Sequence, residues 1–141
     1  MSIEDNKQAV RSFIEEVFNA EPQSAQKFAA QDYVAHDPSG KVMQGMAHNM
    51  AGFRSAFPDL HVTITQLLGE GDLVAAQWTA SGTHQQPMTH LTVEFARPAT
   101  GKSATVTGIS LFRFEGDKIA EMWNHWDTHH LLGQIASPQN P

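Results

Sequence analysis

The chain has 141 residues, no cysteine and a formal net charge of −6 at pH 7. This length predicts one domain with its own core, and the missing cysteine excludes disulfides, thiolate metal ligands and a cysteine nucleophile. An acidic balance without a Lys/Arg cluster argues against a nucleic-acid partner or an anionic membrane surface. Since there is no signal-peptide pattern and no apolar run long enough to span a bilayer, we expect a cytoplasmic protein.

The first half of the chain predicts three helices. Ser2 and Asp5 fit a capping box, and the apolar residues that follow recur on one helical face: Val10, Phe13, Ile14, Val17 and Phe18. Further along we expect a second helix over 22–30, a loop over 33–45 and a third helix over 46–57, which Pro58 ends.

The second half changes to the period of two that is typical of strands. We expect strands over 62–68, 73–81, 89–97, 103–114 and 118–127, joined mostly by short Gly-containing turns, and then a terminal helix over 128–135. Helices followed by antiparallel strands indicate an α+β fold. We therefore expect a single domain over 1–136 and a loose tail over 137–141.

Several of these strands carry apolar residues on both faces. A sheet that curls around its own interior would cover its second face and leave a cavity for a small molecule. The alternative is that the second face meets a partner subunit, and the two are compatible. We expect a small hydrophobic ligand and a homodimer.

Eight phrases in order resemble one family, the SnoaL-like polyketide cyclases of the NTF2-like superfamily. They stand at 13–19, 32–38, 57–63, 71–78, 82–84, 107–114, 116–123 and 124–127, and the resemblance covers about Val10 to Gln134. It implies a cone-shaped half-barrel, with N-terminal helices packed on a strongly curved, mainly antiparallel sheet. It also implies intramolecular aldol cyclisation or a related isomerisation of a small hydrophobic carbonyl compound, without metal or cofactor.

Asp127 matches the position of the family's acid/base at the end of the last strand. An aldol closure needs one proton taken from carbon and one given to oxygen, which a carboxyl group in an apolar pocket can do. The alternative is that Asp127 caps the helix that begins at Thr128. In an unbroken strand His125 shares the face of Asp127 and Trp123, as a hydrogen-bond partner or a second acid/base; a bulge would reverse this.

Further residues are assigned to ligand contact. The resemblance places His36 at the cavity mouth, although Asp37 could instead hold it in a loop. Aromatic residues at strand and helix spacing can line the pocket or simply form core. The full set of substrate-binding candidates is His36, Asn49, Phe18, Trp78, Trp123 and Phe53. The run His125, Asp127, His129 and His130 fits no established metal motif, so we expect no metal site. A binding protein without catalysis, or a dimerisation module, are the competing functions.

Overall fold

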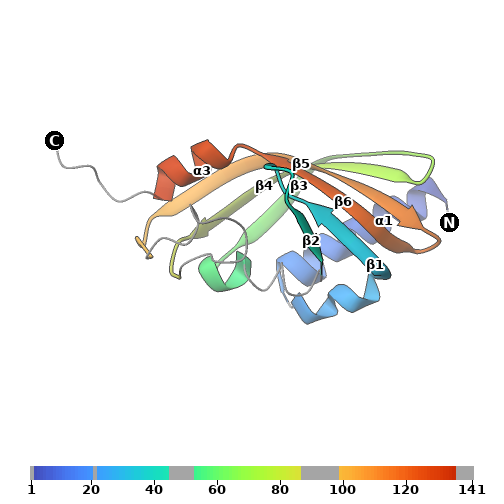
Figure 1. Ribbon diagram of the computed structural model, residues 1–141, viewed down its shortest axis with the longest axis horizontal. Coiled ribbons are helices and arrows are strands. Elements are labelled where there is room, and N and C mark those ends of the chain that lie inside the picture. The colour runs from blue at the N-terminus through green and yellow to red at the C-terminus, as the bar shows by residue number, and fades with distance from the viewer. Residues whose placement is uncertain (1, 21, 45–52, 87–98, 136–141) are drawn as a thin grey trace.

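The computed structural model describes residues 2–20, 22–44, 53–86 and 99–135 (Figure 1). In chain order its elements are helix α1 (Ile3–Phe13), π-helix η1 (Ile14–Phe18), 3-10 helix η2 (Pro22–Lys27), strands β1 (Ala29–His36), β2 (Val42–Gln44), β3 (His61–Glu70), β4 (Leu73–Thr83), β5 (Ser103–Glu115) and β6 (Lys118–Trp126), and helix α3 (Thr128–Ile135). Residues 53–56 are also helical.

The strands of the described residues form one six-stranded sheet in the order β2-β1-β6-β5-β4-β3. All neighbours pair antiparallel except β1 and β6, which are parallel. The sheet curves around the N-terminal helices and stays open between its edge strands, β2 and β3, in the part of the chain described (Figure 1). The predicted α+β half-barrel is confirmed.

Helix α1 begins where the sequence predicts. Ser2 and Asp5 each bond the other's backbone N–H, at 3.0 and 3.3 Å, which satisfies two of the donors that a helix N-terminus leaves free. The apolar face packs on β3 and β4, and the Phe13 ring meets the edge of Phe112 on β5 with centroids 5.7 Å apart. This contact fixes the helices to the inner face of the sheet.

The expectation for residues 22–45 is wrong in part. The second helix ends at Lys27 instead of near Ala30, and Ala29–His36 is a strand where we expected helix and then loop. Tyr33 and Ala35 of β1 are buried while their neighbours are more exposed, but polar Gln31 and Asp32 interrupt that alternation. The strand exists because it pairs with β6, about ninety residues later in the chain, and local sequence carries little of that signal.

The second half follows the prediction more closely. Strands β3 to β6 each begin and end within two residues of the predicted boundaries, and α3 matches residues 128–135. The predicted strand over 89–97, most of the helix over 46–57 and the tail over 137–141 lie outside the described residues.

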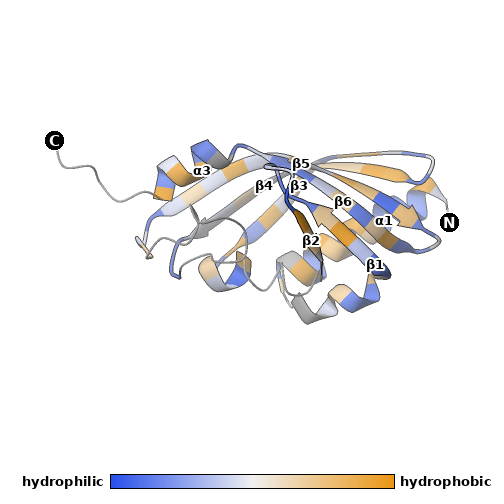
Figure 2. Cartoon of the chain, viewed as in Figure 1, coloured by the Kyte–Doolittle hydropathy of each residue, from blue (hydrophilic) through white to orange (hydrophobic). Residues whose placement is uncertain are grey.

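The two faces of the sheet differ in what covers them. Hydrophobic and hydrophilic residues alternate along the strands in Figure 2. The inner residues pack against the helices, for example Val74, Phe112 and Met122, each exposed by 2% or less. No described helix packs on the outer face. Paired positions there form one row across all six strands, called the outer row: Leu68, Ala75, Leu111, Trp123, His36 and Val42.

Candidate ligand pocket

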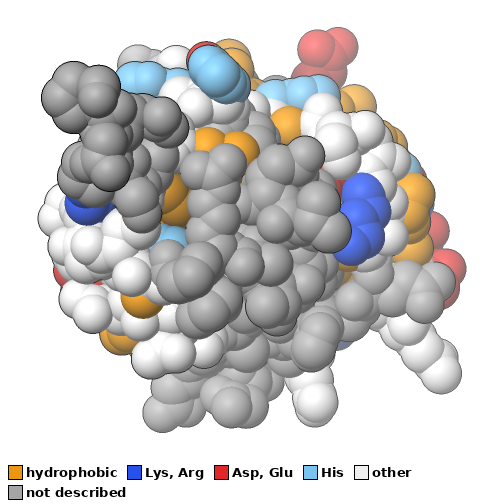
Figure 3. Space-filling view, turned by 60° about the vertical axis from the view of Figure 1, so that its left-hand side comes forward, with side chains coloured by type: hydrophobic (Ala, Val, Ile, Leu, Met, Phe, Trp, Pro, Cys, Tyr) orange, Lys and Arg blue, Asp and Glu red, His pale blue; other side chains and the backbone are white. Residues whose placement is uncertain are grey.

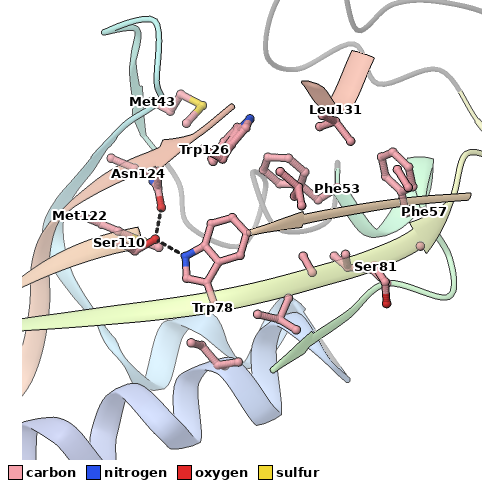
Figure 4. A pocket seen from close by; sticks show the side chains of 18 of the residues that line it. Met43, Phe53, Phe57, Trp78, Ser81, Ser110, Met122, Asn124, Trp126 and Leu131 are labelled. Carbon is pink, nitrogen blue, oxygen red and sulfur yellow. Dashed lines mark hydrogen bonds between the residues drawn. The ribbon is translucent and has the colours of Figure 1, made fainter. Parts of the chain in front are cut away.

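A cavity of about 90 Å³ lies between the inner face of the sheet and the segments that cover it (Figure 4). The strands supply its floor and walls, the helical segment at 53–56 and residues 57–60 contribute Phe53, Phe57 and Leu60, and α3 contributes Leu131. A cavity of this size has room for several water molecules. A larger ligand has to extend beyond it or displace side chains.

The walls of this cavity are apolar with few polar groups. Among the described residues that line it there is no Asp, Glu, His, Lys or Arg, and the side chains that carry a hydrogen-bonding group are Trp78, Ser81, Ser110, Asn124 and Trp126. An ionised ligand group would therefore lose its hydration without a counter-charge from these walls, which is costly. The pocket suits an uncharged molecule.

Three of the polar groups form a directed chain of hydrogen bonds on the floor (Figure 4). Trp78 Nε1 donates to Ser110 Oγ at 2.9 Å, Ser110 Oγ donates to Asn124 Oδ1 at 2.7 Å, and Asn124 Nδ2 donates to the His36 carbonyl at 3.2 Å. The direction is fixed because an indole N–H can only donate and a backbone carbonyl can only accept. The chain comes from strands β4, β5, β6 and β1, so it is preformed by the sheet.

Trp126 lines the same cavity from the end of β6. Its ring centroid is 6.3 Å from that of Trp78 and 5.9 Å from that of Phe53. Its Nε1–H is buried and has no hydrogen-bond partner among the described residues. A buried donor without a partner costs about 1–3 kcal/mol of folding free energy, so the absence of a partner for this N–H calls for an explanation.

The face assigned to the end of the last strand is wrong. Met122, Asn124 and Trp126 line the pocket, whereas Trp123 and His125 point to the outer face, His125 with an exposed side chain. The pairing of β6 with β5 is regular from Gly108 to Arg113, so simple alternation sets which residues face inward. The predicted inward face followed from the expected position of Asp127 in the pocket, which gives the opposite phase of that alternation.

Asp127 lies at the N-terminus of α3 and its side chain is exposed. Its Oδ1 accepts a hydrogen bond of 2.9 Å from the backbone N–H of His130, and its carbonyl accepts from the N–H of Leu131. This is the geometry of a helix N-cap, the alternative left open by the sequence. Asp127 is not among the residues that line the cavity.

His36 also faces the outer side. Its Nε2 is 2.6 Å from Glu121 Oε2, and its ring stacks on Trp123 with centroids 5.5 Å apart and planes 5° apart. The hydrogen bond from His36, followed by that from Arg113, holds the pKa of Glu121 below its usual value. Asp37 does not hold His36; it accepts three hydrogen bonds from Ser39 and Lys41. The expected position of His36 at the cavity mouth is therefore wrong.

Of the other predicted ligand contacts, Trp78 and Phe53 line the cavity. Asn49 and the side chain of Phe18 lie outside the described part of the structure. Ser110, Asn124 and Trp126 line the cavity but are not among the predicted contacts. Ser110 and Asn124 are polar residues two positions from Phe112 and Met122, which lie on the buried face of the same strands, and this spacing could have identified them.

His84 follows β4 and is fully buried. Neither ring nitrogen has a hydrogen-bond partner among the described residues, and the ring packs against Phe57, which lines the pocket, with centroids 5.5 Å apart. Loss of hydration on burial lowers the pKa of His84, and the backbone of Gln86 acts in the opposite direction to a smaller extent. His84 is therefore neutral near pH 7.

Histidine side chains gather along the upper edge of the face in Figure 3, while Lys and Arg are sparse on it. Within the described residues, no three His, Asp or Glu side chains come together as a metal site would require. In the same part of the chain, no helix has the length and apolar character needed to cross a bilayer.

Comparison with solved structures finds proteins of similar fold. A proposed SnoaL-like polyketide cyclase from Jannaschia sp. CCS1 superposes with a TM-score of 0.84 at 19% identity, over 99% of this chain and 97% of the other. A proposed polyketide cyclase from Acidithiobacillus ferrooxidans gives 0.77 at 27% identity, over 96% and 97%. AclR from Streptomyces galilaeus, a proposed hydroxylase, gives 0.78 at 22%, over 98% and 87%.

These neighbours carry different proposed activities on one architecture, so they define the fold and leave the reaction open. Comparison with curated protein sequences finds no match. The sequence model of one family, however, covers residues 8–135, from the middle of α1 to the last residue of α3. With nearly the whole described fold inside that match, the chain belongs to the SnoaL-like polyketide cyclase family.

Proposed function

We propose that this chain binds a small, uncharged and largely apolar metabolite in the pocket. The observation that carries the proposal is the interior cavity whose described lining is apolar apart from hydroxyl, amide and indole groups. Concave, mostly apolar sites with a few placed polar groups are typical of small-molecule binding. The preformed chain from Trp78 to Asn124 supports it, because a rigid polar floor orients a ligand at little entropic cost.

The binding test uses acetophenone as a probe and follows tryptophan fluorescence or amide NMR shifts. Ala80→Leu adds bulk to the pocket wall, while Ala75→Leu makes the same change on the outer face of the same strand. We expect the wild-type chain and Ala75→Leu to bind with similar affinity and Ala80→Leu to lose at least tenfold. Equal affinity in all three proteins would place the probe elsewhere and contradict the proposal.

A second candidate is that the chain also catalyses a proton transfer on the bound compound, as in an aldol cyclisation or an isomerisation. Membership of the family favours it. Asp127 is the proposed acid/base, and it directly follows Trp126, which lines the cavity. In this conformation the Asp127 carboxylate is exposed and bonded to the His130 N–H, so it would have to leave its cap to reach a ligand.

This second candidate can be tested without the natural substrate. In D₂O, proton transfer at the carbon next to the carbonyl exchanges the methyl protons of acetophenone for deuterium, which NMR detects. Catalysis predicts exchange above the buffer rate that Asp127→Asn abolishes, whereas His125→Gln on the outer face leaves it unchanged. Binding of the probe without enhanced exchange would favour a binding function alone.

A further inference from the structure

The polar groups of the pocket differ in what they leave free for a ligand. In the chain of hydrogen bonds, the indole N–H of Trp78 and the hydroxyl hydrogen of Ser110 are both used inside the protein. Asn124 uses one of its two amide hydrogens on the His36 carbonyl, so its second hydrogen remains free among the described contacts. Asn124 lines the cavity and is 8% exposed.

Trp126 supplies a second free donor. Its Nε1–H is buried, without a partner in the described part of the chain, on a residue that lines the cavity. Asn124 and Trp126 are two positions apart on β6 and share its inner face, so their side chains stand about 7 Å apart at the backbone. Both free groups can only donate.

We propose that Asn124 and Trp126 form a donor subsite for an uncharged carbonyl oxygen of the ligand. This proposal rests on the proposed binding function and names the chemical group that the pocket selects. A carbonyl oxygen accepts from N–H groups, and one that reaches the indole N–H relieves the cost of that unpaired donor. A carboxylate would also accept, but the described walls offer no positive side chain to offset its lost hydration.

The test compares three probes of similar shape that differ in one group. Acetophenone carries a ketone, ethylbenzene has a methylene in its place, and benzoate carries a charge. We expect acetophenone and ethylbenzene to bind the wild-type chain and benzoate to bind at least tenfold more weakly than acetophenone. Trp126→Phe keeps an aromatic ring and removes the N–H, so it should weaken acetophenone about three- to tenfold and ethylbenzene less than twofold.

Trp78→Phe is the matched control, because the N–H that it removes already bonds Ser110 inside the protein. We expect it to weaken acetophenone and ethylbenzene by the same factor. A readout on the wild-type chain keeps the test valid if a variant fails to fold. Of the three indole N–H signals, that of Trp126 should move to lower field with acetophenone and stay in place with ethylbenzene.

The outcomes separate the subsite from the binding function. If both neutral probes bind but the ratio of their affinities is unchanged in Trp126→Phe and the Trp126 signal does not move, the subsite is refuted and pocket binding stands. If benzoate binds as well as acetophenone, the selection for an uncharged group is refuted. If neither neutral probe binds the wild-type chain, the binding function fails and the subsite with it.

Discussion

Replacing Asp127 by alanine should destabilise the fold through α3 alone. The carboxylate accepts from the His130 N–H at 2.9 Å, one of the donors that the helix leaves without an internal partner. Loss of an N-cap costs typically about 1 kcal/mol, which for a chain of this size lowers the melting temperature by about 3 °C. The effect should not be masked, because an eight-residue helix is not stable by itself and α3 stays folded only while Leu131 and Ile135 remain docked.

Asp127→Asn is the matched control, since the amide oxygen can accept the same hydrogen bond at the same position. Urea unfolding followed by circular dichroism should give a free energy of unfolding within about 0.5 kcal/mol of the wild type for Asp127→Asn and a clear loss for Asp127→Ala. If the Asp127→Ala variant unfolds like the wild-type chain, the cap contributes nothing and the structural role assigned to Asp127 is refuted. Because asparagine keeps the cap, any loss of proton exchange in that variant reports on chemistry and not on stability.

Three further predictions concern buried and exposed positions. Burial lowers the pKa of His84, so the His84 ring binds a proton more readily in the unfolded chain than in the folded one. The free energy of unfolding should therefore fall as the pH drops below about 6.5, by up to about 1.4 kcal/mol per pH unit. Urea unfolding at several pH values should show that His84→Leu removes this dependence. Gly108→Ala would place a Cβ 2.5 Å from the Trp78 ring and 2.6 Å from the His125 carbonyl oxygen. We expect the free energy of unfolding to fall by about 1–3 kcal/mol and acetophenone to bind more weakly, whereas Thr107→Ala at the exposed neighbouring position serves as the control. The outer face of the six described strands measures about 24 Å by 30 Å, an area close to the roughly 800 Å² that each partner buries in a stable interface. We expect this face to bind a second copy of the chain, so that Ile109→Arg lowers the mass measured by light scattering and Ile3→Arg on α1 does not.

The sequence predicts well wherever a local pattern determines the structure. The capping box at Ser2 and Asp5, the period of two after Pro58 and the start of α3 after Asp127 each depend on neighbours within a few residues. β1 could not be found in this way, because its partner β6 lies far along the chain and its own alternation is interrupted. Non-local pairing of this kind requires knowledge of the topology before the strand can be recognised.

The pocket shows the same limit at the level of single residues. Aromatic residues are predictable candidates, and Trp78 and Phe53 do line the cavity. The contact between Ser110 and Asn124 was not predictable, because each is an ordinary polar residue until the register of β5 and β6 places the two opposite each other. The pairing of Ser110 with Asn124 creates the hydrogen bond, and neither residue alone predicts it.

The phase of β6 also decides how Asp127 could take part in chemistry. Shifting the inward face by one residue moves every side chain of a strand to the other side, and in this chain the inward set ends at Trp126, immediately before the cap. A cap that contributes about 1 kcal/mol favours the conformation with the carboxylate at the His130 N–H over the uncapped one by only about five to one. Ligand binding can supply more free energy than that, so a catalytic Asp127 would release its cap when the pocket fills. Hydrogen exchange at the His130 amide should then speed up with acetophenone bound, whereas a purely structural Asp127 leaves that rate unchanged.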